Sequence, residues 1–497
     1  MLSLLALLTL SELSSLKSDF VREPMMVGFD CNLAYEYRQF GKAWKVGGRP
    51  IDLMRFMSLN GSSWIRVGIT TNATGTLSLD VALKSIEWAR ESAIMIDVFF
   101  YLSSVSADLG KQPAPIGWEG KTVGERASLA REHLKYCVET LIREDATDHF
   151  YEVGNEIDYG ICGSFLSDQT KWPETPDNIE FLKSTVWSEE ALILGEAIAG
   201  LKEADPNAEV TLHLSHWWNL TFCLEFFDFM RSKGVAFDHA GMSYYPSSGI
   251  YDLGEFLGPG RETDADRSAT EFRRTVTGLI QQGYSVIVCE FAYPCTQDIP
   301  GPFAFFDKQL SAYPLDPDGQ ARFIADTLLW LYDQQSVVGA FYFAPHFYET
   351  SLSDVWGAFA LFDENGEARP GAYSIGRFVL LESELVAQLD ARDSLTSAWD
   401  AIELAEMSGR TEGLSEAKQK AEEAWVWYLS GMFGRATRLA SEASEMAEVA
   451  TNPTIRGIFI VVVAVMGLAC LTGVAIIALW MFQRLRRPKA RPPFPPG

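Results

Sequence analysis

Short apolar runs recur along most of the chain, and each is followed by a polar loop and then by a stretch with helical spacing. Helical stretches such as 79–93 and 188–204 carry apolar residues three and four positions apart. Strands that alternate with helices predict a parallel sheet, and runs that are apolar on both faces fit strands covered by helices. Eight repeats over roughly 320 residues predict an α/β fold, a closed (β/α)8 barrel with enlarged loops, because no GxGxxG turn of a doubly wound sheet follows the first run. The runs are MMVGFD (25–30), WIRVGI (64–69), IMIDVFFY (94–101), HFYEVGNE (149–156), EVTLHL (209–214), HAGMSYY (239–245), SVIVCE (285–290) and GAFYFA (339–344).

The composition changes after residue 376. Two segments, 380–409 and 415–450, are rich in Ala, Glu and Leu and have helical spacing. Gly431 and Gly434, near the middle of the second segment, predict a helical hairpin similar to one tetratricopeptide unit. Because a single unit of this kind cannot bury its apolar face alone, we interpret residues 377–452 as a helical stalk that packs on the barrel or on an unknown protein partner.

A different pattern occupies the carboxyl end. Residues 457–482 form a run of 26 residues without a charge, which is long enough to cross a bilayer as one helix. Five basic residues follow in the tail, residues 483–497, which predicts that the tail is cytoplasmic. Residues 1–20 begin with the apolar stretch MLSLLALLTL, which indicates a signal segment, with a cap on the bottom of the barrel as the alternative. The sequence therefore predicts a single-pass protein of the cell membrane, with the barrel at residues 21–376 outside the cell.

Composition and charge exclude some functions. A formal net charge of −25 argues against a nucleic-acid partner, because phosphate binding needs a basic surface. Six of the seven cysteines lie outside the apolar run 457–482, and six cysteines permit about 15 pairings, so no disulfide is assigned. No spacing of cysteines indicates a zinc site, and we expect neither a metal ion nor a cofactor.

Polar side chains stand where the predicted strands end. In a (β/α)8 barrel the carboxyl ends of the strands form the active site. Asn155 and Glu156 end the fourth run, and Glu290 ends the seventh. These two strands lie across the mouth from one another, and a structural barrel has no need of acidic residues on both. The alternative role for Glu156 is a loop cap or a salt bridge. The other polar residues at strand ends are Arg66, His213, Tyr244 and Tyr245.

Two carboxylates that face one another across a cleft are the requirement for hydrolysis of a glycosidic bond. We assign Glu156 as the general acid/base and Glu290 as the nucleophile. Mutual repulsion and partial burial would raise the pKa of one of them and keep it protonated near neutral pH. Asn155 can bind the 2-hydroxyl of the attacked sugar, and Arg66 together with one of the strand-six tyrosines would hold the nucleophile ionised and oriented.

Six segments, in order and at suitable spacing, carry a resemblance to a known family. They are VGNEIDYG (153–160), LHL (212–214), FDHAGMSYYP (237–246), CEFAYP (289–294), ADLGKQPAPIGW (107–118) and WGAFALFDENG (356–366). Over about residues 25–375 the chain resembles glycoside hydrolase family 53, the arabinogalactan endo-β-1,4-galactanases. The resemblance implies a polysaccharide substrate and retention of configuration, with carboxyl groups roughly 5–5.5 Å apart. His213 matches the family's strand-five histidine, and Tyr244, Tyr245 and Tyr293 lie in matching segments, so we expect these four residues to bind substrate together with Asn155 and Arg66. Trp118 and Trp356 are candidate sugar contacts by loop position, with core packing as the alternative.

Two segments depart from the family pattern. After strand three the family has Asp-Phe-His-Tyr-Ser-Asp, where this chain has FFYLSS at residues 99–104. On strand eight the family's Tyr-Trp-Glu-Pro becomes YFAP at residues 342–345, so Phe343 replaces a sugar-stacking tryptophan. Loss of polar groups that recognise hydroxyls weakens discrimination among sugars. We therefore expect poor activity on plain galactan and a preference for a decorated or different β-glycan.

The sequence supports functions from two classes. A membrane-anchored endo-β-glycosidase is favoured, because a binding protein has no use for a pair of like charges such as Glu156 and Glu290. Within this class, another retaining β-1,4-glycanase of the mannanase or glucanase type is the alternative. A non-catalytic carbohydrate-binding surface protein built on the same barrel represents the other class.

Overall fold

The computed structural model divides into two compact units. The first unit is Met1–Leu385 and the second is Val386–Gly497. The structure describes residues 25–172, 174–249, 265–299, 301–347, 356–375, 382–429 and 432–452.

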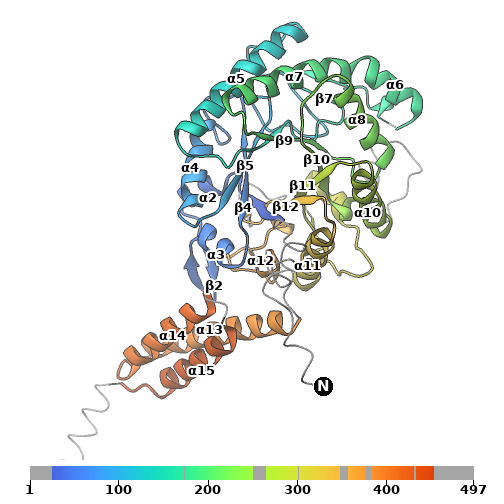
Figure 1. The fold of residues 1–497 in the computed structure, drawn as a ribbon. Helices are drawn as coiled ribbons and strands as arrows, with labels where there is room; N and C mark the ends of the chain where they lie inside the picture. Colours follow the sequence, from blue (N-terminus) through green and yellow to red (C-terminus); the bar gives the residue numbers. More distant parts are fainter. Residues whose placement is uncertain are drawn as a thin grey trace, which may run out of the picture. The chain divides into compact units, whose positions relative to one another are not determined.

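Eight parallel strands close into a barrel in the first unit (Figure 1). Around the barrel the order is β1-β4-β5-β6-β9-β10-β11-β12, and β12 pairs with β1. Each strand overlaps one of the eight apolar runs, so the predicted (β/α)8 barrel is confirmed. The strands are β1 (Met26–Asp30), β4 (Trp64–Ile69), β5 (Met95–Phe100), β6 (Phe150–Val153), β9 (Glu209–Leu214), β10 (His239–Tyr244), β11 (Ser285–Phe291) and β12 (Val337–Tyr342).

Helices surround the barrel (Figure 1), and the strands are buried on both faces. Inward side chains fill the barrel, while outward side chains contact the helices, which explains why the runs lack polar alternation. The helices are α2 (Ala34–Gln39), α3 (Leu53–Leu59), α4 (Leu79–Arg90), α5 (Val123–Arg143), α6 (Pro176–Ser184), α7 (Val186–Ala204), α8 (Leu220–Ser232), α10 (Ala265–Gln281), α11 (Pro317–Asp333) and α12 (Gly371–Ser374). Two hairpins, β2 (Trp44–Val46) with β3 (Arg49–Ile51) and β7 (Gly160–Ile161) with β8 (Ser164–Phe165), and four 3-10 turns, η1 (Gln169–Lys171), η2 (Pro246–Ser248), η3 (Gly301–Phe306) and η4 (Trp356–Ala358), lie in the loops.

Side-chain caps determine where helices begin after the loops of the barrel mouth. α5 begins with a capping box, in which Thr122 Oγ1 accepts from the Glu125 N–H at 3.3 Å and the Glu125 carboxylate accepts from the Thr122 N–H at 2.7 Å. α8 begins after Asn219, whose Oδ1 accepts from the Phe222 N–H at 3.0 Å. Such caps satisfy N–H groups that the first helical turn leaves without partners.

The second unit is helical and has an alanine-rich interior. α13 (Glu382–Met407) spans the boundary between the units and is followed by α14 (Leu414–Leu429) and α15 (Phe433–Val449). α14 ends and α15 begins around the position where Gly431 and Gly434 predict a turn. Alanine combines the highest helix propensity with a small side chain, so helices that bury it can approach closely. The fully buried alanines are Ala391, Ala398, Ala405, Ala417, Ala421, Ala424, Ala436, Ala440, Ala443 and Ala447.

The predicted membrane-spanning segment, residues 457–482, lies outside the described residues, as do the basic tail 483–497 and the amino-terminal segment 1–20. In the part of the chain that the structure describes, no helix has both the length and the apolar character needed to span a bilayer.

Two glycines of α7 differ in their surroundings, which predicts opposite effects of the same substitution. A Cβ added at Gly200 would lie 2.3 Å from the Arg131 carbonyl oxygen of α5, whereas a Cβ at Gly195 would meet nothing within 4 Å. We expect Gly195→Ala to stabilise the protein by roughly 0.5–1 kcal/mol through helix propensity. We expect Gly200→Ala to destabilise it by roughly 1–3 kcal/mol through overpacking. Urea unfolding measures both, and equal effects would contradict the close approach of α5 and α7.

Candidate active site

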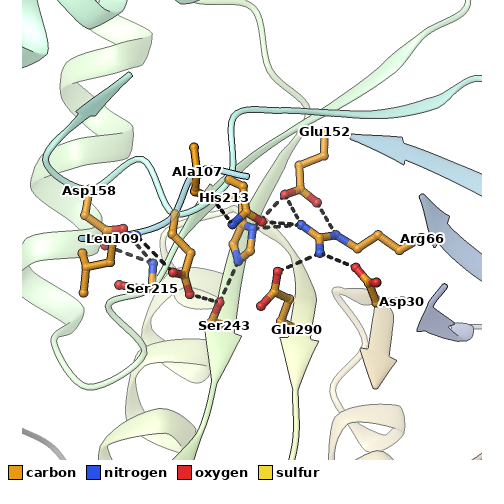
Figure 2. Close-up of polar contacts among 12 residues, drawn as sticks. Asp30, Arg66, Ala107, Leu109, Glu152, Asp158, His213, Ser215, Ser243 and Glu290 are labelled. Carbon is orange, nitrogen blue, oxygen red and sulfur yellow. Dashed lines mark hydrogen bonds and ion pairs between the residues drawn. The ribbon is translucent and has the colours of Figure 1, made fainter. Parts of the chain in front are cut away.

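Arg66 on β4 is completely buried at the centre of the site. Its guanidinium group contacts three carboxyl groups from three other strands (Figure 2). Nη1 donates to Asp30 on β1 at 3.1 Å and to Glu290 on β11 at 2.8 Å. Nε and Nη2 donate to the two oxygens of Glu152 on β6, at 2.9 and 2.6 Å. The bidentate contact with Glu152 fixes the plane of the guanidinium group and thereby the direction from which it meets Glu290.

Two further contacts hold Arg66 in place. Nη2 donates to Asn155 Oδ1 at 2.7 Å, and Asn155 Nδ2 donates to the Ala107 carbonyl at 3.0 Å. The ring centroid of Phe99 on β5 lies 3.7 Å from the guanidinium carbon, which is a cation–π contact. Asn155 therefore ties the loop after β6 to the charged centre of the barrel.

Glu290 lies near the end of β11 and is 6% exposed. Its Oε1 accepts from Arg66, and its Oε2 accepts from the Tyr245 hydroxyl at 2.6 Å. Burial and the negative charge of Glu290 raise the pKa of Tyr245 well above its usual range, so the phenol keeps the proton that it donates. Two donors, one of them a cation, orient the Glu290 carboxyl group and stabilise negative charge on it.

Glu156 lies in the turn that follows β6 and keeps part of its surface exposed. The turn needs left-handed backbone, with φ of 88° at Gly154 and 49° at Glu156 itself. Such a φ at a residue other than glycine costs free energy, and strained residues of this kind cluster at active sites. Glu156 Oε1 accepts from the Ser243 hydroxyl at 2.6 Å, and Oε2 accepts from the Leu109 N–H at 3.2 Å.

Burial, followed by the negative charge of Glu290, raises the pKa of Glu156 to about 7. The positive charge of His213 and the hydrogen bond from Ser243 act in the opposite direction and are weaker. A protonated carboxyl group thus lies near an oriented anion, an arrangement suited to acid–base chemistry. No ion pair of Glu156 occurs among the described residues, so the structure does not support a role for it as a salt bridge.

The buried residues around Glu156 and Glu290 shift one another's pKa values. Although burial opposes it, the positive charges of Arg66 and His213 lower the pKa of Glu152 to about 2. Glu152 in turn raises the pKa of His213, again against the effect of burial. Burial raises the pKa values of Asp30 and Asp97 to about 7 each. Below that pH the two cations therefore face an ionised Glu152, while Asp30 and Asp97 retain their protons.

Two of the predicted substrate contacts point away from the mouth. Tyr244 lies on the outer face of β10, and its ring stacks on Phe272 of α10 at 3.7 Å. The ring of Tyr293 stacks on Phe323 of α11 at 4.6 Å. Successive side chains of a strand face opposite sides, so Tyr244 points outward and Tyr245 inward. In place of the predicted contact with substrate, both Tyr244 and Tyr293 pack between the barrel and its helices.

The two predicted tryptophans occupy different surroundings. The ring of Trp356 lies 4.7 Å from Phe343 and 6.3 Å from Tyr245, measured between centroids, which places it beside the phenol that contacts the nucleophile candidate. Trp118 is half-buried in a turn closed by a 2.9 Å hydrogen bond from its backbone N–H to the Pro115 carbonyl. Within the described ranges, no hydrogen bond joins Trp118 to a carboxyl group of the site.

Four polar residues of the site were not predicted: Asp30, Glu152, Ser243 and Gln112. Gln112 Nε2 donates to the Glu156 carbonyl at 3.2 Å and so holds the turn after β6. A charged residue inside an otherwise apolar run was a signal for Glu152. Strand alternation was a signal for Ser243, because residues two positions apart share a face. Gln112 lies in a long loop, and its only signal in the sequence is its place in the segment 107–118 that resembles the family.

Glu152, His213 and Cys289 each place one potential ligand atom within 4.8 Å of the others. Both oxygens of Glu152 already accept hydrogen bonds from Arg66. A metal ion at this position would lie beside the guanidinium group, and two positive charges at that distance repel strongly in a buried site. We therefore assign these three residues to hydrogen bonding and packing.

Comparison with known proteins agrees with this geometry. The model of glycosyl hydrolase family 53 matches residues 26–374, which include every strand of the barrel. The chain is similar to the arabinogalactan endo-beta-1,4-galactanase of Cellvibrio japonicus, with 23% identity over 354 residues that cover 67% of this chain and 84% of that protein.

Solved structures show the same fold. The chain is similar to the family 53 catalytic domain from Ignisphaera aggregans, with 22% identity, a TM-score of 0.60, and coverage of 72% of this chain and 96% of that one. It is also similar to a fungal β-1,4-galactanase, with 18% identity, a TM-score of 0.58, and coverage of 71% and 99%. At these identities the structural likeness shows the fold alone.

Proposed function

Because the chain belongs to glycosyl hydrolase family 53, we propose that it is a retaining endo-β-glycosidase that hydrolyses β-1,4-galactan or a related β-glycan. The observation that carries this proposal is the pairing of Glu156 with Glu290. Burial and the charge of Glu290 raise the pKa of Glu156 to about 7, whereas Glu290 accepts from a cation and a phenol. An acid and an anion with such different surroundings supply the two roles that glycoside hydrolysis needs.

In the first step, Glu290 attacks the anomeric carbon. A bond forms between a carboxylate oxygen and that carbon, the glycosidic C–O bond breaks, and Glu156 donates its proton to the leaving oxygen. Arg66 and Tyr245 hold Glu290 in one orientation, which limits the motion needed to reach the reacting geometry. The product is a glycosyl ester of Glu290 with inverted configuration.

In the second step, water attacks the same carbon and releases Glu290, while Glu156 accepts the proton of the water. Formation of the ester removes the negative charge of Glu290, which is one cause of the raised pKa of Glu156. The pKa of Glu156 therefore falls in the intermediate, so that the group ionises and can act as a base. Two inversions at one carbon give net retention.

The residues around this pair favour an apolar sugar face over recognition of hydroxyl groups. Phe99 and Tyr101 stand where the family has an aspartate and a histidine, and their ring centroids are 4.8 Å apart. Phe99 also covers Arg66. Phe343 and Trp356 form a second aromatic pair beside Tyr245. Aromatic rings bind the apolar face of a pyranose but form few hydrogen bonds with its hydroxyl groups. We therefore infer a substrate other than plain galactan.

Oligosaccharide release from a panel of galactan, arabinogalactan, mannan and glucan tests the substrate class. We expect faster release from a decorated or different β-glycan than from unsubstituted β-1,4-galactan, because Phe99 and Tyr101 replace an aspartate and a histidine and Phe343 replaces a sugar-stacking tryptophan. Internal cutting gives products of many lengths. Fast cleavage of unsubstituted galactan would show that these positions do not set specificity, and no cleavage of any glycan would contradict the proposed function.

Chemical rescue with azide tests the two catalytic roles. Glu290→Ala should lose activity, and azide should restore turnover and give a glycosyl azide of inverted configuration, because azide replaces the missing nucleophile. Glu156→Ala should lower turnover by about 10²–10⁴-fold and give a glycosyl azide of retained configuration, because Glu290 still forms the ester. NMR of the products measures the configuration.

Two adjacent tyrosines provide the matched control for these variants. Tyr245→Phe removes a hydrogen bond to Glu290 and should lower turnover, whereas Tyr244→Phe changes a ring on the outer face of β10 and should not. Inverted product from the unmodified protein would show that Glu290 is not a nucleophile.

We further propose that residues 457–482 anchor the enzyme in the cell membrane with the barrel outside. The 26-residue uncharged run and the basic residues after it support this orientation. A chain truncated before Gly457 should be recovered without detergent, whereas the full chain should remain with membranes. Protease added to intact cells should digest the barrel and spare an epitope on the tail, and loss of that epitope would reverse the orientation.

A further inference from the structure

A continuous line of hydrogen bonds joins Glu156 to the buried interior of the barrel (Figure 2). The Ser243 hydroxyl lies 2.6 Å from Glu156 Oε1 and 2.9 Å from His213 Nε2. His213 Nδ1 lies 2.7 Å from Glu152 Oε1. Ser243, His213 and Glu152 are all buried, with exposed fractions of 0%, so solvent does not compete for these bonds.

The chemistry of these groups determines the direction of each bond. An ionised Glu152 can only accept, so His213 Nδ1 carries a proton and donates it. The Ser243 hydroxyl donates to Glu156 Oε1, so its oxygen can accept from Nε2, and the negative charge of Glu152, which raises the pKa of His213 against the effect of burial, favours a proton on Nε2 as well. That N–H donates to the oxygen of Ser243. The single hydroxyl proton of Ser243 is then directed to Glu156.

We propose that Ser243 is a positioning residue, which transmits the charge state of the buried Glu152–His213 pair to Glu156 by keeping its hydroxyl donor directed at the acid/base carboxyl group. This inference rests on the proposed function, in which Glu156 is the acid/base. Ser243 acts through Glu156 and does not itself touch the reacting atoms.

Other groups near Glu156 do not substitute for this donor. The charges of Glu290 and of Asp108 raise the pKa of Glu156, and the Leu109 N–H contacts the other oxygen, Oε2, at 3.2 Å. Around His213, the charge of Arg66 lowers the pKa of the imidazole and that of Glu290 raises it, but both act less strongly than Glu152. Asp97 is also near, and burial raises its pKa to about 7.

The hydrogen bond from the Ser243 hydroxyl to Glu156, which we call the tether, has a consequence in each half of the reaction. The Ser243 hydroxyl contacts Oε1 at 2.6 Å and the Leu109 N–H contacts Oε2 at 3.2 Å, so the proton that Glu156 donates to the leaving group is carried by Oε2, the oxygen with the longer contact. As that proton leaves, negative charge develops on a carboxyl group that already accepts an oriented hydrogen bond, so no reorganisation is needed. In the second step the same donor stabilises the ionised base.

The experiment measures the pKa of Glu156 in the full chain by carboxyl ¹³C NMR, with the resonance assigned by its loss in Glu156→Gln. We expect Ser243→Ala to raise this pKa by about one pH unit, because the lost bond favoured the ionised form. Ser243→Thr, which keeps the hydroxyl, should restore it. The matched control is Ser215→Ala, which removes a buried hydroxyl without a hydrogen-bond partner in the described structure and should change nothing. An unchanged pKa in Ser243→Ala would overturn the proposal.

Glu152→Gln separates the tether from simple charge effects. Loss of a negative charge alone would lower the pKa of Glu156. Loss of the proton on His213 also removes a positive charge, which raises the pKa of Glu156 whether or not Ser243 is present. If the tether operates, Ser243 in addition turns its hydroxyl toward Nε2, so Glu152→Gln should raise the pKa of Glu156 more in the chain that keeps Ser243 than in Ser243→Ala. Equal changes in the two backgrounds would overturn the proposal, and so would a fall in the chain that keeps Ser243, even if Ser243→Ala did not fold.

The NMR measurement does not require turnover, so the two proposals can fail separately. If the chain hydrolyses no glycan but the pKa of Glu156 is shifted in Ser243→Ala, the proposed function is wrong and the tether stands. If the chain is active but the alkaline limb of its kcat/KM profile is the same in Ser243→Ala as in the unmodified chain, the tether is wrong and the proposed function stands.

Discussion

The site depends on one guanidinium group enclosed in a closed barrel. Arg66 cannot be solvated, so it needs buried acceptors for its N–H groups, and the barrel brings the carboxyl groups of Asp30, Glu152 and Glu290 to it from three strands. Arg66 and the imidazolium of His213 supply two positive charges for a larger number of buried carboxyl groups. The remaining groups stay protonated up to about pH 7, and Glu156 is among them. Burial is the largest cause of each of these raised pKa values, and the positive charges of Arg66 and His213 outweigh burial at Glu152.

The barrel could be predicted because its strands are buried on both faces and leave short, largely apolar runs, several of which end in a polar residue. Asn155, Glu156 and Glu290 were singled out because they stand at those ends, whereas Arg66 is the third residue of β4 and lies within the strand. Side-chain direction was harder to predict, since Tyr244 and Tyr245 are adjacent and only one can face inward. Which of the two faces inward depends on which residues of β10 point into the barrel, and the register of β10 with β11 shifts between Met242 and Ser243. A shift of this kind arises from packing between strands, and one strand's sequence does not encode it.

Residues that stabilise other residues were the ones that sequence reasoning missed. The position of Glu152 inside an apolar run and the strand alternation at Ser243 are signals of inward side chains, but neither signal names the partners of these residues. Their importance arises from distances between β6, β9 and β10, and these exist only after the barrel has closed. Gln112 illustrates the same limit, because it holds the turn of Glu156 from a loop that precedes it by more than forty positions.

The departures on strand three connect this electrostatic centre with specificity. Phe99 stands where the family has an aspartate, and its ring covers the guanidinium group at 3.7 Å. An aspartate there would add another buried carboxyl group beside the guanidinium group. The aromatic ring instead gives Arg66 a neutral partner, and the positive charge of Arg66 remains available to Glu152 and Glu290. Under the proposed function, the replacement that we infer to change sugar recognition therefore leaves the contacts of Arg66 with Glu152 and Glu290 in place.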